Sequence, residues 1–215
     1  MLRLRVISRL FAGAVAAGAT MRDCTRAARR YSGLLSTGSG AWMQIRDAVA
    51  ADAAAIAAIY NHAVCETTAI WNEVEVDAAN RAAWIAERQG AGFAVLAAED
   101  AGEVLGYAAY GPWRAFDGFR QTVEHSVYVA QGAQGRGLGR KLLAALIDRA
   151  RASDLHVMVA GIEAGNMGSL RLHAALGFEL VAMMPQVGQK FGRWLDLAFL
   201  QLKLDDRDAP GKGGA

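Results

Sequence analysis

The spacing of hydrophobic residues changes several times between residues 43 and 205. Residues 43–48 (MQIRDA) predict a short strand. Residues 48–64 place isoleucine, tyrosine and alanine at the three- and four-residue spacing of one helix face. Asp77 is the type of residue that caps a helix N-terminus, and it precedes a second helical pattern at residues 78–89. The first part of this region is therefore expected to be a strand followed by two helices.

The remaining pattern alternates between strands and helices. Residues 93–100 and 104–111 are largely apolar runs separated by a turn at Gly102, which indicates a hairpin. Residues 169–178 have a helical pattern that Gly177 closes. The segment MPQVGQKFGRW is expected to connect the last two strands. Strands are also predicted at residues 122–129, 155–162 and 190–204, and a helix follows the glycine-rich segment at residue 137.

The composition changes at Met43. Residues 1–42 are rich in arginine and poor in acids, and we expect a non-domain N-terminal extension. A weak secretory signal, an organellar transit peptide and a start codon assigned too far upstream are its alternative interpretations. Residues 43–205 are expected to form one domain, and residues 206–215 a flexible charged tail.

Charge and cysteine content narrow the function classes. Seven arginines and one aspartate give residues 1–42 a charge of +6, which leaves −4 for the remainder of a chain whose net charge is +2. Nucleic acid is not an expected partner of a mildly acidic domain, because that affinity rests on neutralising phosphates. The two cysteines and four histidines lack metal-ligand spacing, so we predict no metal. No run is long enough for a membrane span, and a cytoplasmic location is expected.

Three glycines, Gly135, Gly137 and Gly139, lie directly before and at a predicted helix start. A helix start carries unpaired N–H groups and partial positive charge, which suit a phosphate. Glycines allow the backbone to approach such a ligand closely, and Arg136 and Arg140 add charge. The segment is therefore interpreted as a pyrophosphate-binding loop.

Other known phosphate-binding loops match this segment less well. The sequence contains no G-x-x-x-x-G-K-[ST] run, and its glycines do not have G-x-G-x-x-G spacing. The pattern around it does not predict the βαβ unit of a dinucleotide-binding fold. A glycine-rich turn that binds no ligand remains an alternative, since short motifs match by chance.

Gln134, Gly137 and Gly139 fit the form Gln-x-x-Gly-x-Gly, placed between a strand and a helix. This resembles the signature of the GCN5-related N-acetyltransferase (GNAT) family. The segments IYNHAV, TTAIWN, GPWRAFDGFR, TVEHSVYV and SLRLHAALGF resemble its phosphinothricin acetyltransferase branch, and within it the bacterial methionine sulfoximine/methionine sulfone acetyltransferases. The resemblance covers nearly everything after Met43. It implies an α+β (α/β) fold with a mixed, mostly antiparallel central sheet, flanking helices and a V-shaped opening between the two central strands.

The resemblance also implies acetyl transfer from acetyl-CoA to a primary amine, and it assigns roles to residues. Glu124 is the expected general base, and His173 is the alternative. Strand alternation predicts that the His125 side chain points to the sheet face opposite Glu124. The implied substrate contacts are Arg114, Ala115, Phe116, Glu124, His125 and Ser126, with Arg114 on the substrate carboxylate. The implied acetyl-CoA contacts are Val127, Tyr128, Val129, Gly135, Arg136, Gly137, Leu138, Gly139, Arg140, Asn166 and Ser169.

Three functions follow as hypotheses. The first is acetylation of the α-amine of a small amino acid analogue such as methionine sulfoximine, methionine sulfone or phosphinothricin, as detoxification or herbicide resistance. The second is acetylation of a peptide or protein N-terminus, and the third is a non-catalytic acetyl-CoA sensor. The resemblance further implies a homodimer in which Phe191 to Trp194 lie near the partner's site.

Overall fold

The computed structural model describes residues 43–210. The predicted extension at residues 1–42 and the last part of the predicted tail, residues 211–215, lie outside the described residues. Arg207, which lies in the described part of that tail, pairs with Asp154 (2.6 Å) and Asp205. Contacts of the folded part therefore continue at least two residues beyond the predicted boundary at 205.

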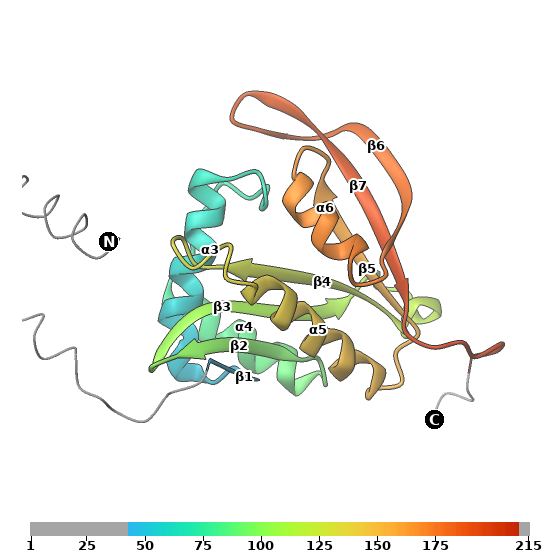
Figure 1. The fold of residues 1–215 in the computed structure, drawn as a ribbon, viewed down its shortest axis with the longest axis horizontal. Coiled ribbons are helices and arrows are strands. Elements are labelled where there is room, and N and C mark those ends of the chain that lie inside the picture. Colours follow the sequence, from blue (N-terminus) through green and yellow to red (C-terminus); the bar gives the residue numbers. More distant parts are fainter. Residues whose placement is uncertain (1–42, 211–215) are drawn as a thin grey trace, which may run out of the picture. The chain divides into compact units, whose positions relative to one another are not determined.

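Seven strands form one mixed sheet in the order β1-β2-β3-β4-β5-β7-β6 (Figure 1). All neighbouring pairs are antiparallel except β4 and β5, which are parallel. The strands are β1 (Gln44–Asp47), β2 (Val95–Asp100), β3 (Glu103–Pro112), β4 (Thr122–Val129), β5 (Val157–Glu163), β6 (Glu179–Lys190) and β7 (Arg193–Lys203). The predicted mixed, mostly antiparallel sheet is confirmed.

The helices of the described region are α3 (Ala53–Glu66), α4 (Ala78–Gly90), α5 (Leu138–Arg151) and α6 (Met167–Ala174), with short 3₁₀ turns η2 (Ala50–Asp52) and η3 (Asp117–Phe119). Asp77 caps α4 as predicted, because its side chain accepts a hydrogen bond from the Asn80 N–H at 2.7 Å. Gly177 has a φ of 89° and ends the turn after α6, where the Phe178 N–H donates to the His173 carbonyl.

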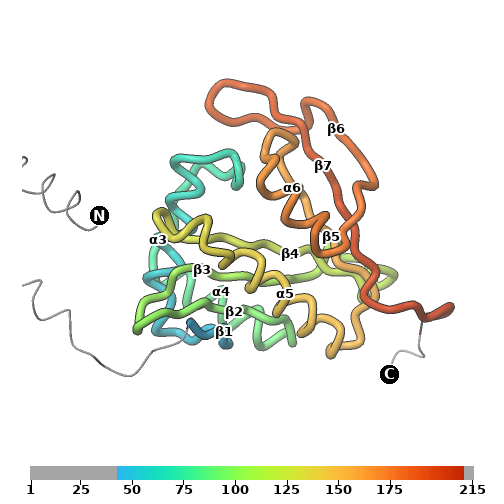
Figure 2. The backbone as a smooth tube through the Cα atoms, viewed as in Figure 1, coloured from blue at the N-terminus to red at the C-terminus, as the bar shows by residue number. Residues whose placement is uncertain are grey.

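Helices cover both faces of the sheet, and strand alternation explains how (Figure 2). On β2, Leu96 and Ala98 belong to the core beneath α5, whereas Val95 and Ala97 belong to the core beneath α3 and α4. The apolar runs that predicted these strands are continuous because both of their faces are buried. Hydrophobic burial on two sides holds the strands of the site in fixed positions.

The helix α5 connects the parallel strands β4 and β5, so the glycine loop does lie within a βαβ unit. The expectation that no such unit surrounds it was wrong. The sequence pattern shows which segments are strands, but it does not show that two of them pair in parallel. That pairing is set by the crossover helix packing back onto the sheet.

The two central strands separate along their length. Residues 122–124 of β4 pair with residues 157–159 of β5, and the register ends there. Residues 125–129 continue to pair with β3 but have no partner on β5. The predicted V-shaped opening is confirmed, and it leaves backbone hydrogen-bonding groups of β4 and β5 without strand partners.

The β6–β7 hairpin is longer than the sequence indicated. Residues 184–194 are mostly strand, and only Phe191 and Gly192 form the turn, with positive φ values of 51° and 69°. The hairpin holds the segment that follows α3, because the buried Lys190 ammonium donates to the carbonyls of Ala63, Thr67 and Ile70. It therefore fixes one wall of the opening between β4 and β5.

Candidate active site

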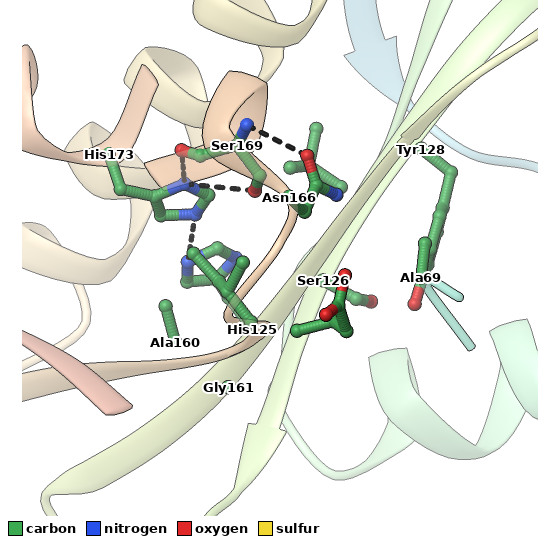
Figure 3. Close-up of a pocket in the computed structure, with 12 residues that line it drawn as sticks. Ala69, His125, Ser126, Tyr128, Ala160, Gly161, Asn166, Ser169 and His173 are labelled. Carbon is green, nitrogen blue, oxygen red and sulfur yellow. Dashed lines mark hydrogen bonds between the residues drawn. The ribbon is translucent and has the colours of Figure 1, made fainter. Parts of the chain in front are cut away.

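Two hollows meet at the opening between β4 and β5. The first lies against α6 and is lined in part by Asn166, Ser169 and His173 (Figure 3). The second lies against α4 and is lined in part by Trp84, Arg88 and Glu124. Both are lined by His125, Ser126, Tyr128 and Gly161. A group bound in one hollow can therefore reach a group bound in the other through the sheet.

The glycine loop has the backbone conformation that its sequence suggests. Gly135 and Gly137 have φ values of 75° and 78°, a region that other residues rarely adopt. Gly137 is the N-cap of α5, and no side chain caps this helix end. The first N–H groups of α5 thus lack a side-chain acceptor and are available to an anion. Arg136 of the loop pairs with Asp100 at 3.0 Å.

The strand segment Val127 to Val129 borders the opening, and Val127 and Tyr128 line the first hollow. Because its backbone has no partner on β5, an extended ligand with amide groups fits there as an additional strand. Asn166 and Ser169 are close together, with the Asn166 side chain accepting from the Ser169 N–H at 3.1 Å. This bond caps α6 and positions both polar side chains at the hollow.

Glu124 lies in the second hollow, on the α4 side of the sheet, and is half-buried. Its Oε1 atom is 3.1 Å from the position that a Cβ at Gly161 would occupy, so the carboxylate leans toward the opening. Burial raises the pKa of Glu124, and the positive charge of Arg114 partly opposes that shift. A carboxylate with a raised pKa is a better proton acceptor, which suits a general base.

His173 and His125 form a buried pair on the opposite face of the sheet, as alternation predicted for His125. Their rings stack with centroids 5.0 Å apart, and their Nε2 atoms are 3.2 Å apart. The Nδ1–H of His173 donates to the Ser169 carbonyl at 2.7 Å, which leaves its Nε2 to accept from His125. Burial lowers the pKa of His173, and it lowers the pKa of His125 to about 3.

The structure therefore separates the two predicted catalytic residues. Glu124 is in the hollow against α4, whereas both ring nitrogens of His173 are engaged by His125 and Ser169 on the α6 side. Within residues 43–210, the buried Nδ1 atom of His125 has no hydrogen-bond partner. The histidine pair is stacked and hydrogen-bonded, so its geometry favours a role in shaping the wall of the first hollow.

The predicted substrate segment Arg114 to Phe116 is exposed and follows the end of β3. The Arg114 guanidinium lies 4.6 Å from the centre of the Trp113 ring. Its positive charge lowers the pKa of the Glu124 carboxyl. Phe116 is 76% exposed among the described residues.

Sequence reasoning missed the residues of the second hollow that α4, β3 and β5 contribute: Trp84, Arg88, Ala109, Tyr110, Gly111, Pro112 and Gly161. Trp84 and Arg88 lie on α4, far from the glycine signature in the sequence. The only available signal was a pair of large side chains four residues apart, which is also typical of ordinary helix packing. Within the described residues, no three His, Cys, Asp or Glu side chains gather in an arrangement suited to a metal ion.

Comparison with known proteins identifies the family. The family model described as "Acetyltransferase (GNAT) family" matches residues 56–178. The matched region includes the glycine loop, the β4 residues that line the two hollows, and α6. The chain belongs to the GNAT family. As a GNAT protein it is an acetyltransferase, and the predicted enzyme class, fold and family are confirmed.

Two relatives place the chain within the GNAT family. It is 62% identical over 168 residues to the L-methionine sulfoximine/L-methionine sulfone acetyltransferase of Salmonella typhimurium, covering 78% of this chain and 98% of the relative. It is 40% identical over 165 residues to the phosphinothricin N-acetyltransferase of Streptomyces coelicolor, covering 75% and 96%. The branch that the sequence resembled is confirmed.

Two solved structures share the GNAT fold of this chain. An acetyltransferase from Salmonella typhimurium, solved with its cofactor acetyl-CoA, has a TM-score of 0.78 and 62% identity, covering 79% of this chain and 98% of that one. A ribosomal-protein-alanine N-acetyltransferase from Brucella melitensis has a TM-score of 0.73 and 56% identity, covering 74% and 99%. In the described part of the chain, no helix is both long enough and apolar enough to cross a membrane.

Proposed function

We propose that this GNAT enzyme transfers an acetyl group from acetyl-CoA to the α-amine of a small amino acid analogue, namely methionine sulfoximine, methionine sulfone or phosphinothricin. The observation that carries the proposal is the pair of hollows that share His125, Ser126, Tyr128 and Gly161. One hollow suits an extended thioester cofactor and the other suits a compact amine. The names of the relatives at 62% and 40% identity supply the substrate class.

The glycine loop and the first hollow together fit acetyl-CoA. The uncapped start of α5 and the left-handed Gly135 and Gly137 would hold its pyrophosphate, with Arg136 and Arg140 adding charge. The unpaired edge of Val127 to Val129 would pair with the amides of its pantetheine arm. Leu138 and Gly139 complete the helix start, and Asn166 and Ser169 border the arm. Acetyl-CoA supplies the acetyl group when it is bound.

The residues of the second hollow would prepare the amine. A protonated amine cannot attack, and Glu124 stands at the opening to accept its proton. Arg114 would hold the α-carboxylate, since its planar guanidinium matches a carboxylate in two parallel hydrogen bonds. Ala115 and Phe116 would border this end of the substrate, and His125 and Ser126, which line the second hollow, would form its inner wall. Acetylation of such analogues would detoxify them and would confer resistance to phosphinothricin as a herbicide.

A second candidate function is acetylation of a peptide or protein N-terminus. It is favoured by the solved structure from Brucella melitensis at 56% identity, which is named a ribosomal-protein-alanine N-acetyltransferase. The two candidates make different demands on the substrate. A free amino acid presents its α-carboxylate to Arg114, whereas a peptide has an amide at that place.

Steady-state kinetics of the wild-type protein tests the proposed function. L-methionine sulfone, L-methionine sulfoximine and phosphinothricin are compared with an alanine-initiated peptide and with the decarboxylated analogue of the sulfone. Preferred turnover of the free amino acids supports the proposal. Turnover of the peptide alone would replace it with the second candidate.

We also propose that the enzyme works as a homodimer in the cytoplasm, where its free thiol Cys65 would stay reduced. Large apolar side chains cluster on the β6–β7 hairpin and are exposed in the single chain: Leu180, Val181, Met183, Met184, Val187, Phe191 and Trp194. Large apolar side chains exposed in such number on one element are typical of an interface. Sedimentation of Trp194→Ala, which is expected to shift the protein toward monomer, tests this assembly.

A further inference from the structure

The Arg88 guanidinium lies directly on the backbone of Gly111, inside the hollow that contains Glu124. Its Nη1 atom is 1.5 Å from the position that a Cβ on Gly111 would occupy, so any other residue at 111 would displace it. Arg88 comes from the last turn of α4 and is half-buried. The Arg88 guanidinium thus occupies a space against Gly111, the cradle of Arg88, that only a glycine at position 111 leaves open.

Within residues 43–210, this guanidinium has no hydrogen-bond acceptor and no ion-pair partner, although it lines the hollow. A cation at the end of a helix is also favourable for the helix dipole. That effect operates equally well when the side chain extends into solvent, so it does not explain the cradle at Gly111. A partly desolvated guanidinium with unused donors is what a site for an oxygen-rich group requires.

The position of Arg88 within the hollow indicates which part of a substrate would reach its guanidinium. Gly111 is the cross-strand partner of Glu124, on the β3 side. The Glu124 carboxylate leans the other way, toward Gly161 and the opening to β5. Arg88 is therefore displaced from the amine position by about one strand spacing, roughly 5 Å. Trp84 lines the space between the helix and the sheet and offers an apolar surface.

We infer that Arg88 binds the terminal oxygens of the substrate's side chain: those of a sulfone, a sulfoximine or a phosphinate. The amine would lie at Glu124, the α-carboxylate at Arg114, the methylene groups against Trp84, and the oxidised end at Arg88. This inference rests on the proposed function and deepens it, because it explains how the enzyme would select methionine sulfone over unoxidised L-methionine. A hydrogen-bonding site rejects an analogue that lacks the oxygens, because its own donors are then left unpaired.

The test compares L-methionine sulfone with L-methionine as substrates of three variants. Arg88→Met removes the charge at similar length, and Gly111→Ala keeps Arg88 but fills its cradle. Arg171→Met is the matched control, since Arg171 is an exposed arginine in the last turn of another helix and lines neither hollow. We expect the preference for the sulfone, measured as the ratio of kcat/KM values, to fall about 10- to 100-fold in both test variants and to be kept in the control.

The outcomes separate this inference from the function on which it rests. Failure of the wild-type protein to acetylate methionine sulfone overturns the proposed function, and this inference with it. If the wild type is active and Arg88→Met loses activity equally on both substrates, or on neither, only the Arg88 assignment is overturned. Unfolding of Gly111→Ala, detected by circular dichroism, leaves the decision to Arg88→Met, whose side chain needs no new space.

Discussion

Glu124 and His173 face the same opening between β4 and β5 from opposite sides of the sheet. Glu124 lines the hollow against α4, and His173 is bonded to Ser169 and His125 in the hollow against α6. The alternation of side chains along β4 produces this separation, since Glu124 and His125 are neighbours in the chain. Of these two residues, Glu124 is the one that lines the α4 hollow, where we propose that the amine binds.

Glu124→Gln is therefore expected to lower kcat by about 10²- to 10⁴-fold, because glutamine keeps the shape of the side chain and removes the proton acceptor. Acetyl-CoA binding, measured by calorimetry, should stay near the wild-type value. The loss should become smaller at high pH, where more of the amine is already deprotonated. His173→Gln serves as the comparison, and a larger loss there than in Glu124→Gln would reverse the assignment.

Arg114→Gln should change both substrate affinity and pH dependence. The KM for methionine sulfone should rise about 10- to 100-fold, because a charge-assisted pair with the α-carboxylate is lost. The Arg114 charge also lowers the pKa of Glu124, against the upward effect of burial. Removal of the Arg114 charge raises the pKa of Glu124, so the carboxylate becomes protonated at a higher pH. The acid limb of the kcat/KM profile then moves to higher pH. A shift of the acid limb to lower pH, or an unchanged KM for methionine sulfone, would contradict this role of Arg114.

Gly137→Ala is expected to weaken both the fold and cofactor binding. Its φ of 78° costs an alanine roughly 1–2 kcal/mol, and the new methyl group enters the space in front of the α5 N-terminus. Urea unfolding and calorimetry with acetyl-CoA measure the two effects. Gly118→Ala is the matched control, because Gly118 has open space around it and no positive φ. Wild-type affinity in Gly137→Ala would show that the loop does not hold the pyrophosphate.

Burial of His125 predicts a loss of stability in mild acid. Its pKa is lowered to about 3 by burial, while an unfolded histidine has its ordinary value of 6.5. Below pH 6.5 the unfolded chain takes up a proton that the folded chain does not, so the free energy of unfolding falls by about 1.4 kcal/mol per pH unit until pH 3. Urea unfolding of the wild type and of His125→Leu between pH 6.5 and 5 measures this dependence. The free energy of unfolding of the variant should fall less steeply with decreasing pH. Equal slopes would mean that His125 is protonated in the folded protein.

Lys190→Met should destabilise the protein by about 2–3 kcal/mol, since a buried ammonium is replaced and three carbonyl acceptors lose a charged donor. Lys203→Met, at an exposed position of β7, should change the stability by less than about 0.5 kcal/mol. Thermal unfolding of both variants provides the measurement. Because Lys190 holds the segment that carries Ala69, a wall residue of the first hollow, the KM for acetyl-CoA should also rise in Lys190→Met.

The sequence alone determined the elements and the family. Continuous apolar runs predicted β2, β3 and β5, Asp77 predicted the start of α4, and the glycine-rich segment predicted the start of α5. Each of these signals is local, because caps, turns and burial on two faces constrain the residue types at neighbouring positions. The motifs around β4 and the glycine loop were specific enough to indicate the GNAT family and the central opening.

Only the tertiary structure decided which side chains share a hollow. The parallel pairing of β4 with β5, and its end after Glu124, depend on how α5 packs across the sheet. Arg88 reaches Gly111 from a helix whose sequence shows only an ordinary amphipathic pattern. Contacts between residues distant in the chain arise from packing of whole elements, and a single sequence carries no local signal for them. The candidate carboxylate Glu124 was therefore visible from the sequence, whereas the contact of Arg88 with Gly111 was not.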